Sequence, residues 1–247
     1  MVKPYEYYHN NVYGMMCLLD VMKENNVDKI VFSSTAATYG EPKNIPIMED
    51  DETNPTNTYG ETKLAMEKMM KWFDNAYGIK YVSLRYFNAA GAYFDGSIGE
   101  DHKTETHLIP LILQVPLGKR SHISIFGNDY DTKDGTCIRD YIHVRDLAMA
   151  NCKAVLNFDK AFERAGKDYT NYLSLNIGSG VDVTVKEFII AFENVTQEKI
   201  NTVMGKRREG DIGGSYANIQ LAKRTIDWKP EYSIEDAIFD VLKYYEL

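Results

Sequence analysis

The stretch Lys29-Ile30-Val31-Phe32-Ser33-Ser34 contains a short apolar run without the alternation expected of a strand that has one face in water. Such a run predicts a strand that is buried on both faces, as in a parallel sheet. Apolar residues recur at helical spacing just before it, from Val12 to about Glu24, and Asn10 or Asn11 can cap that helix. Tyr81–Phe87 predicts a second buried strand. Helices alternating with buried strands indicate the α/β class.

A loop from Gly40 to Thr58 and a predicted helix, which runs to Tyr77 and ends at Gly78, separate the two strands. Tyr59 and Lys63 stand four positions apart where this helix begins, so they share one of its faces. A neighbouring cation favours the phenolate, and the lysine should therefore lower the tyrosine pKa. A tyrosine tuned in this way can take a proton from a sugar hydroxyl. The spacing alone is more typical of a solvated helix face than of a catalytic pair, so its meaning depends on the surrounding motifs.

The overall composition limits the classes of function. The chain has 247 residues, 44% of them hydrophobic and 26% charged, which is enough for one large or two modest domains. Its formal net charge of −8 argues against a broad nucleic-acid surface but leaves room for a local cationic pocket. Three widely spaced cysteines predict neither a disulfide framework nor a zinc site, and we expect a cytoplasmic protein without a membrane span or a metal site.

The second half of the chain predicts shorter elements. His107–Leu113 should be a helix with Pro110 in its first turn, and Asp146 can cap a helix from Leu147 to Phe158. Thr184 with Glu187, and Ser233 with Asp236, have the spacing of capping boxes that open the last two predicted helices. Further strands are expected at 122–127 and 172–178.

Several motifs together resemble the UDP-glucose 4-epimerase family of extended short-chain dehydrogenase/reductases. Three of them are shared across extended reductases, namely Phe32-Ser33-Ser34-Thr35-Ala36-Ala37-Thr38-Tyr39-Gly40, the Tyr59/Lys63 pair and Arg85-Tyr86-Phe87-Asn88. The others are more particular to epimerases: Ile125-Phe126-Gly127-Asn128-Asp129-Tyr130, the run Asp134–Val144, and Arg207-Arg208-Glu209-Gly210-Asp211. The resemblance implies an NAD-binding Rossmann domain, a doubly wound parallel sheet, followed by a smaller α/β domain that binds a UDP-sugar. We expect the first at 1–96 and the second mainly at 97–247, with segments near 137–178 returning to the Rossmann sheet.

The resemblance also assigns roles to single residues. Tyr59 would be the acid/base, Lys63 its cationic partner and a nicotinamide-ribose contact, and Thr35 the hydroxyl that binds the sugar O4. Further cofactor contacts are implied for Lys3, Asn10, Ser33 and Phe87. UDP-sugar contacts are implied for Asn88, His107, Ser124, Ile125, Phe126, Arg139, Arg208, Asp211 and Ser215. The two arginines suit a diphosphate, because guanidinium groups match phosphate oxygens in geometry.

The implied reaction is the redox-neutral interconversion of UDP-glucose and UDP-galactose through a 4-keto intermediate with bound NAD. The small residue Ser215 is compatible with UDP-GlcNAc and UDP-GalNAc as well, and an active enzyme without UDP-GlcNAc turnover would contradict this. The family's paired helices imply a homodimer. A 4,6-dehydratase of the same fold would need an Asp-Glu pair after the threonine, where this chain has Ala36-Ala37.

The sequence departs from the family in one respect. The glycine-rich loop that opens the family's Rossmann domain, Gly-x-x-Gly-x-x-Gly, does not occur in these 247 residues. We therefore expect a truncated Rossmann domain, and a fragment that retains no tightly bound NAD and is inactive alone. Stoichiometric nicotinamide released on denaturation would contradict that expectation. The alternative is a non-catalytic chain that binds UDP-sugar or pairs with another subunit.

Overall fold

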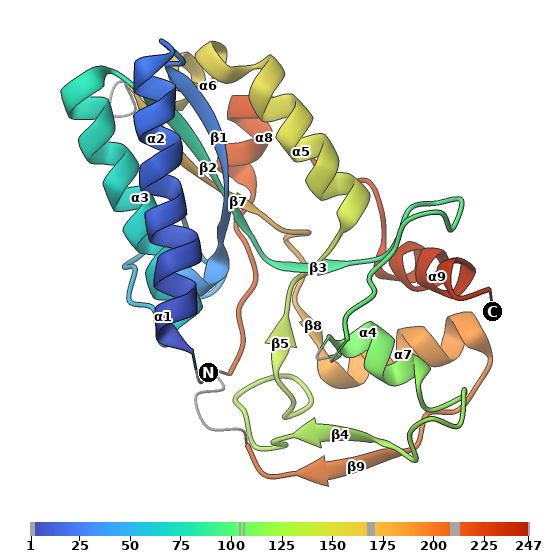
Figure 1. Ribbon diagram of the computed structural model, residues 1–247. Helices are drawn as coiled ribbons and strands as arrows, with labels where there is room; N and C mark the ends of the chain where they lie inside the picture. Colours follow the sequence, from blue (N-terminus) through green and yellow to red (C-terminus); the bar gives the residue numbers. More distant parts are fainter. Residues whose placement is uncertain (1–2, 104, 106, 167–170, 208–212, 247) are drawn as a thin grey trace. The chain divides into compact units, whose positions relative to one another are not determined.

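The computed structural model describes residues 3–246 except 104, 106, 167–170 and 208–212 (Figure 1). The chain forms two compact units. Unit 1 comprises residues 1–87, 148–177 and 217–229, and unit 2 comprises residues 88–147, 178–216 and 230–247. The expected domain boundary near residue 96 stays a prediction.

Unit 1 is built on a parallel sheet of the order β1-β2-β7. Its strands are β1 (Lys29–Thr35), β2 (Lys80–Tyr86) and β7 (Tyr172–Ile177). The central strand β2 is buried along its middle, as its unbroken apolar character predicts. The three strands predicted here are confirmed, and with them the α/β class and the parallel sheet.

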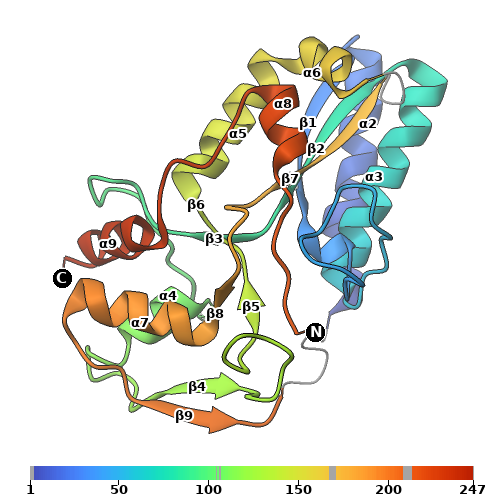
Figure 2. The same cartoon turned by 180° about the vertical axis from the view of Figure 1, so that it is seen from behind.

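Helices cover both faces of this sheet (Figures 1 and 2). One face carries α2 (Gly14–Glu24) and α3 (Thr58–Tyr77), and the opposite face carries α5 (Val144–Leu156), α6 (Phe158–Ala165) and α8 (Gln220–Ile226). Methionines dominate the packing of α2 and α3 on the sheet, in a buried cluster of Met15, Leu19, Met22, Phe32, Met66, Met70, Ile79 and Tyr81. Thioether side chains are flexible enough to fill such an irregular gap.

The first helix begins earlier than its sequence predicts. A continuous helical segment runs through α1 (Pro4–Tyr7) and a π-helical stretch (Tyr8–Tyr13) into α2. The prediction that Asn10 or Asn11 caps the helix is therefore wrong. Pro4 is tolerated in the first turn, where no backbone N–H is needed. The Asn11 amide instead donates a hydrogen bond to Thr62 Oγ1 at 2.9 Å, which ties this segment to α3.

A buried ion pair joins α3 to the central strand. Glu67 and Arg85 meet at 2.7 Å, and each side chain is only 7% exposed. Arg85 binds both carboxylate oxygens of Glu67, and its Nη1 donates to the Tyr39 hydroxyl at 2.9 Å. Ser34 on β1 also donates to Glu67, at 2.5 Å. Because every member is satisfied, this network can be accommodated inside the unit.

Glu49, which lies beside this network, makes stability depend on pH. Burial is the main reason why the pKa of Glu49 is raised to about 7, although its carboxylate accepts the Asn176 N–H at 3.0 Å. Between about pH 4.5 and 7 the unfolded chain ionises this group while the folded chain still holds the proton, so the free energy of unfolding falls as pH rises. We expect the Glu49→Gln variant to be more stable than the wild type at pH 8 by about 2–3 kcal/mol and no more stable at pH 4.5. Urea unfolding at both pH values measures this, and a difference independent of pH would contradict it.

Unit 2 is made of short strand pairs and three helices in the described residues. The pairs are β3 (Asn88–Ala90) with β6 (Tyr141–His143), β4 (Ile123–Phe126) with β9 (Thr202–Gly205), and β5 (Ile138–Arg139) with β8 (Val183–Thr184). The helices are α4 (Leu108–Leu113), α7 (Val185–Thr196) and α9 (Ile234–Tyr244). Apolar side chains of all three helices meet those of β3 and β4 in one core that includes Ile112, Ile125, Phe188, Phe192 and Ile238.

Both predicted capping boxes are confirmed, at Thr184 with Glu187 and at Ser233 with Asp236. The predicted start of α5 at Leu147 is wrong, since the helix begins at Val144. Asp146 does not cap it. Its carboxylate instead accepts the backbone N–H groups of Glu231 and Tyr232 at 3.0 and 3.1 Å. Among the described helices, none combines the length and apolar character that crossing a membrane requires.

Candidate active site

Tyr59 lies in the first turn of α3, where it meets the end of β1. Asn57 caps the helix by accepting the Gly60 N–H at 2.8 Å. A Cβ on Gly60 would lie 2.4 Å from the Ala37 carbonyl oxygen, so only glycine lets the helix start pack so closely on the turn after β1. This close approach brings the Tyr59 side chain near Thr35, the last residue of β1, whose hydroxyl acts to lower the Tyr59 pKa.

Lys63 lies one turn further along the same helix. Its ammonium donates a hydrogen bond to the Ser33 carbonyl oxygen at 2.9 Å and lies 5.8 Å from the centre of the Tyr59 ring. It also lies 5.0 Å from the centre of the Phe32 ring. No ion pair with Lys63 occurs within the described residues. The structure thus brings the three predicted catalytic residues, Thr35, Tyr59 and Lys63, into one place.

The expected direction of the Tyr59 pKa is wrong. Burial raises the pKa of Tyr59, with a smaller increase from Tyr7, and the hydrogen bond from Thr35 opposes them. Burial also lowers the pKa of Lys63. Spacing along a helix predicts that two side chains meet, but it does not predict how much water they lose. The lysine ammonium is directed at the Ser33 carbonyl, which weakens the effect on the phenol that the spacing suggested.

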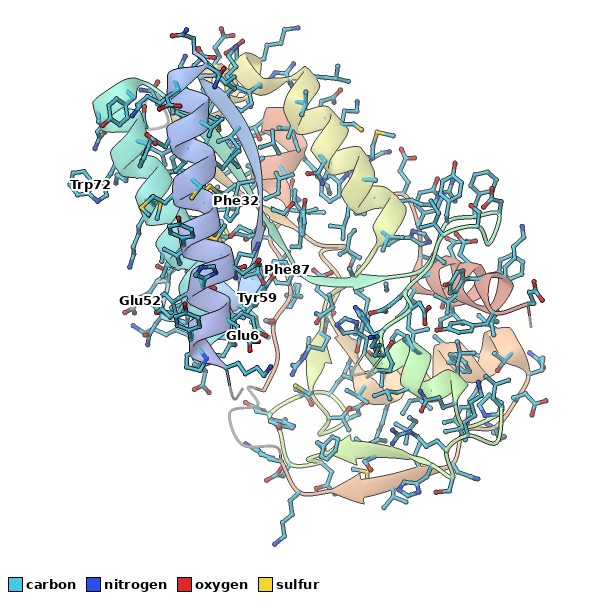
Figure 3. All side chains as sticks on the ribbon, in the orientation of Figure 1. Glu6, Phe32, Glu52, Tyr59, Trp72 and Phe87 are labelled. Carbon is cyan, nitrogen blue, oxygen red and sulfur yellow. The ribbon has the colours of Figure 1, made fainter. Side chains whose placement is uncertain are left out.

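Of the other predicted cofactor contacts, Ser33 and Phe87 lie in unit 1 near the ends of β1 and β2. The Ser33 hydroxyl is 3.0 Å from the Tyr86 hydroxyl, which also bonds to Asn151, and Phe87 is buried. Tyr59 and Phe87 lie at the same end of unit 1 in Figure 3. Ligands of open α/β sheets bind at the carboxyl ends of the strands, where these residues lie.

Lys3 and Asn10, the remaining predicted cofactor contacts, are exposed, and within the described part of the chain they form no ion pair or hydrogen bond with Thr35, Tyr59 or Lys63. Lys3 pairs with Glu6 at 2.9 Å, and Asn10 donates to Asn11 at 3.2 Å. Sequence reasoning missed Tyr7, whose ring meets the Tyr59 ring edge-on at 6.2 Å between centres. Tyr7 and Asn11 are four positions apart and so share one helical face, and Asn11 anchors that face to α3. This spacing was the signal in the sequence that could have identified Tyr7.

Unit 2 contains a pocket of about 350 Å³. Five of the predicted substrate contacts line it: Asn88, His107, Ser124, Phe126 and Arg139. Sequence reasoning did not identify the other polar and aromatic lining residues, which include Glu100, Arg120, Tyr141, Tyr244 and Tyr245. The last two come from α9 and the residue after it, and no local pattern indicates that this helix end returns to the pocket.

The pocket carries two guanidinium groups. Arg139 Nη1 donates to the Ile138 carbonyl oxygen at 2.9 Å and also contacts Cys137 Sγ, so its side chain is held in place. Asn88 is fixed as well, because its amide donates to the Asp140 carbonyl oxygen at 2.9 Å. Together with Arg120, these groups offer positive charge and a hydrogen-bonding amide on a largely apolar wall, which suits an anionic ligand with an apolar or aromatic part.

Two further predicted substrate contacts, Ile125 and Ser215, are described by the structure but do not line this pocket. Ile125 is buried in the core of unit 2, because alternate residues of β4 face opposite sides and Ser124 and Phe126 take the pocket side. Ser215 is half-buried and donates its N–H to the Ile138 carbonyl oxygen at 3.3 Å, without lining the pocket. Arg208 and Asp211 lie outside the described residues.

The residues of unit 1 fit the nicotinamide-ribose end of NAD, the cofactor implied by the resemblance. A half-buried ammonium and a half-buried phenol meet at the carboxyl end of a parallel strand, beside the Ser33 carbonyl. Hydroxyl groups of a ribose can bind both kinds of group. Lys63 and Tyr59 would therefore hold that end of the cofactor, and the cofactor would supply hydride transfer.

Comparison with known proteins supports NAD as the cofactor. The chain matches the NAD dependent epimerase/dehydratase family over residues 1–170. It is 52% identical over 230 residues to a UDP-glucose 4-epimerase of Halalkalibacterium halodurans, and the match covers 93% of this chain and 66% of the relative.

Solved structures agree as well. A UDP-glucose 4-epimerase from Bifidobacterium longum in complex with NAD+ and UDP matches with 38% identity and a TM-score of 0.88, over 99% of this chain and 71% of that one. One from Brucella ovis in complex with NAD matches with 40% identity and a TM-score of 0.87, over 96% of this chain and 70% of that one. The chain thus spans about two thirds of the length of its relatives.

These matches confirm, at the level of the family, the predicted resemblance, the Rossmann-type fold, the isomerase class and the use of NAD. The chain therefore belongs to the NAD dependent epimerase/dehydratase family, among its UDP-glucose 4-epimerases.

Proposed function

We propose that this chain carries the proton-transfer site and the substrate pocket of an NAD-dependent UDP-hexose 4-epimerase, which interconverts UDP-glucose and UDP-galactose. The observation that carries the proposal is the meeting of Thr35, Tyr59 and Lys63 at the end of β1. A phenolate that lies near an ammonium and a hydroxyl can take a proton from a sugar hydroxyl, and the phenol that results can return it.

Each residue has a separate task in this proposal. The Tyr59 oxygen removes the proton from the sugar O4 and gives it back after the sugar has turned over. The Thr35 hydroxyl, which lies near Tyr59, accepts or donates the hydrogen bond that positions O4. The positive charge of Lys63 favours the phenolate, the form that Tyr59 must have before it can take the O4 proton, against the opposing effect of burial. NAD would supply the hydride chemistry at C4.

The pocket of unit 2 is proposed as the UDP-sugar site. Arg139 and Arg120 would neutralise the diphosphate, and Asn88 would donate a hydrogen bond to the substrate. Ser124, Phe126 and His107 supply further wall contacts. The proposal also includes substrate contacts from four further residues: Ile125 through its backbone, Ser215, Arg208 and Asp211. It includes cofactor contacts from Lys3, Asn10, Ser33 and Phe87.

The Arg139→Ala variant tests the substrate pocket. We expect it to weaken UDP binding by roughly 10- to 100-fold, because a charge-assisted hydrogen bond to the diphosphate is lost. Isothermal titration of UDP into the chain measures this and requires no turnover. Arg224→Ala removes an exposed arginine of α8 and serves as the matched control, for which we expect unchanged affinity. Equal UDP affinity in the Arg139→Ala variant and the wild type would contradict the assignment of the pocket.

Three finer points complete the proposal. Exposed apolar side chains on α2 and α3, among them Met16, Leu18 and Trp72, support a homodimer in which these helices pair. In Figure 3, Trp72 projects away from the rest of unit 1.

Turnover of UDP-GlcNAc and UDP-GalNAc stays a prediction that rests on Ser215. A cytoplasmic location is supported by three cysteines that form no disulfide, all of them described.

A further inference from the structure

Four side chains of the loop before α4 converge in unit 2. Glu100, His102, Glu105 and His107 each offer one ligand atom, and these atoms all lie within 4.8 Å of one another. The spacing Glu-x-His-x-x-Glu-x-His was the signal in the sequence, which we had expected to hold no metal site. Two of the four, Glu100 and His107, also line the pocket of unit 2.

Each carboxylate in this cluster faces both imidazoles. Glu100 Oε1 lies 2.8 Å from His102 Nδ1 and also contacts His107 Nδ1. The oxygens of Glu105 lie 3.7 Å from His102 Nδ1 and 3.9 Å from His107 Nδ1. The four donor atoms thus lie close to one another and do not form two separate pairs.

The backbone helps to hold this arrangement. The Glu105 carboxylate accepts the backbone N–H of His107 at 2.8 Å, and the Tyr245 hydroxyl donates to the Glu100 carbonyl oxygen at 3.2 Å. The two carboxylates are less exposed than the imidazoles, at 28% and 10% against 55% and 59%. Hydrogen bonds to the groups around a metal orient its ligands and so raise its affinity.

Two imidazole nitrogens and two carboxylate oxygens form a donor set that zinc prefers. Zinc binds both kinds of ligand at about 2.0–2.2 Å with tetrahedral geometry, which places neighbouring donors about 3.3–3.6 Å apart. The separations of 2.8, 3.7 and 3.9 Å in the cluster lie on both sides of that value. Small rotations of exposed side chains would therefore open the cluster around an ion.

We propose that Glu100, His102, Glu105 and His107 bind one zinc ion. The ion joins the loop to the start of α4 and so fixes one wall of the pocket, since Glu100 and His107 belong to that wall. This site goes beyond the epimerase reaction, because proton transfer by Tyr59 needs no metal. Its test therefore does not depend on turnover.

Titration of Zn²⁺ into the full chain against a chromophoric chelator tests the proposal. We expect one ion per chain. The His102→Ala and Glu105→Gln variants should each bind zinc at least about 10- to 100-fold more weakly. His122→Ala and His9→Ala, which remove exposed or half-exposed histidines elsewhere, are the matched controls and should bind as the wild type does. A circular-dichroism spectrum and melting temperature of each zinc-free variant show that it is folded.

X-ray absorption at the zinc edge identifies the ligands. We expect two nitrogen and two oxygen neighbours at about 2.0–2.2 Å. Sulfur neighbours would overturn the proposal, because they would place the ion on the exposed Cys17 or Cys152. The absence of binding, or equal binding by the wild type and the folded His102→Ala variant, would also overturn it. Neither outcome would touch the assignment of the UDP pocket, which the UDP titration tests separately.

Discussion

Replacing Tyr59 by phenylalanine is expected to lower epimerase turnover by about 10²- to 10⁴-fold, the usual contribution of a general acid/base. The substitution removes only the hydroxyl, the group that would exchange the proton with the sugar O4 near Thr35. UDP affinity should not change, because the pocket of unit 2 is lined by other residues. Turnover of UDP-galactose is measured with added NAD in a chimera in which residues 3–247 replace the matching stretch of the Halalkalibacterium halodurans relative.

Tyr77→Phe is the matched control for this experiment. Tyr77 is the last residue of α3 and is 56% exposed, so loss of its hydroxyl should leave turnover unchanged. If the Tyr59→Phe variant kept more than one tenth of the wild-type turnover, another group would be the acid/base and the assignment of Tyr59 would fail.

The Glu67→Ala substitution is expected to cause the largest loss of stability, about 3–5 kcal/mol in the free energy of unfolding. It leaves the Arg85 guanidinium buried without its carboxylate, and it also removes the acceptor of the Ser34 hydroxyl. Desolvating an unpaired charge costs more than the pair itself contributes. Urea unfolding followed by far-ultraviolet circular dichroism measures the change.

Glu52→Ala is the control, because Glu52 pairs with Lys43 on the surface, where the two side chains are 65% and 80% exposed. Exposed pairs of this kind contribute little, so we expect no measurable change. Equal unfolding midpoints for the Glu67→Ala and Glu52→Ala variants would contradict the account of the buried network.

Most of what the sequence did not predict depends on contacts between groups that are distant in the sequence. The apolar runs of β1, β2 and β7 and the two capping boxes follow from local chemistry and were predicted correctly. Asp146 was taken for a helix cap, but it binds backbone N–H groups 85 and 86 residues away. Short strands such as β5 and β8 have too few residues for a pattern and depend on their partners.

In the candidate site too, some features follow from the local sequence and others depend on residues that are distant in the sequence. The meeting of Tyr59 with Lys63 follows from helix geometry, and the motifs around them supplied Thr35. The direction of the Tyr59 pKa did not follow, since it depends on burial by groups that are distant in sequence. Tyr244 and Tyr245 on the pocket wall come from the far end of the chain, and the Glu-x-His-x-x-Glu-x-His spacing becomes a cluster only once the loop is folded.

The interconversion of UDP-galactose and UDP-glucose tests the central claim most directly. Proton NMR of UDP-galactose, incubated with NAD and the chimera that carries residues 3–247, should show UDP-glucose appearing until the same ratio is reached from either sugar. The Tyr59→Phe form of the chimera should show almost none over the same time. A folded chimera that binds both UDP and NAD but produces no UDP-glucose would contradict the claim that these residues carry out epimerisation at O4.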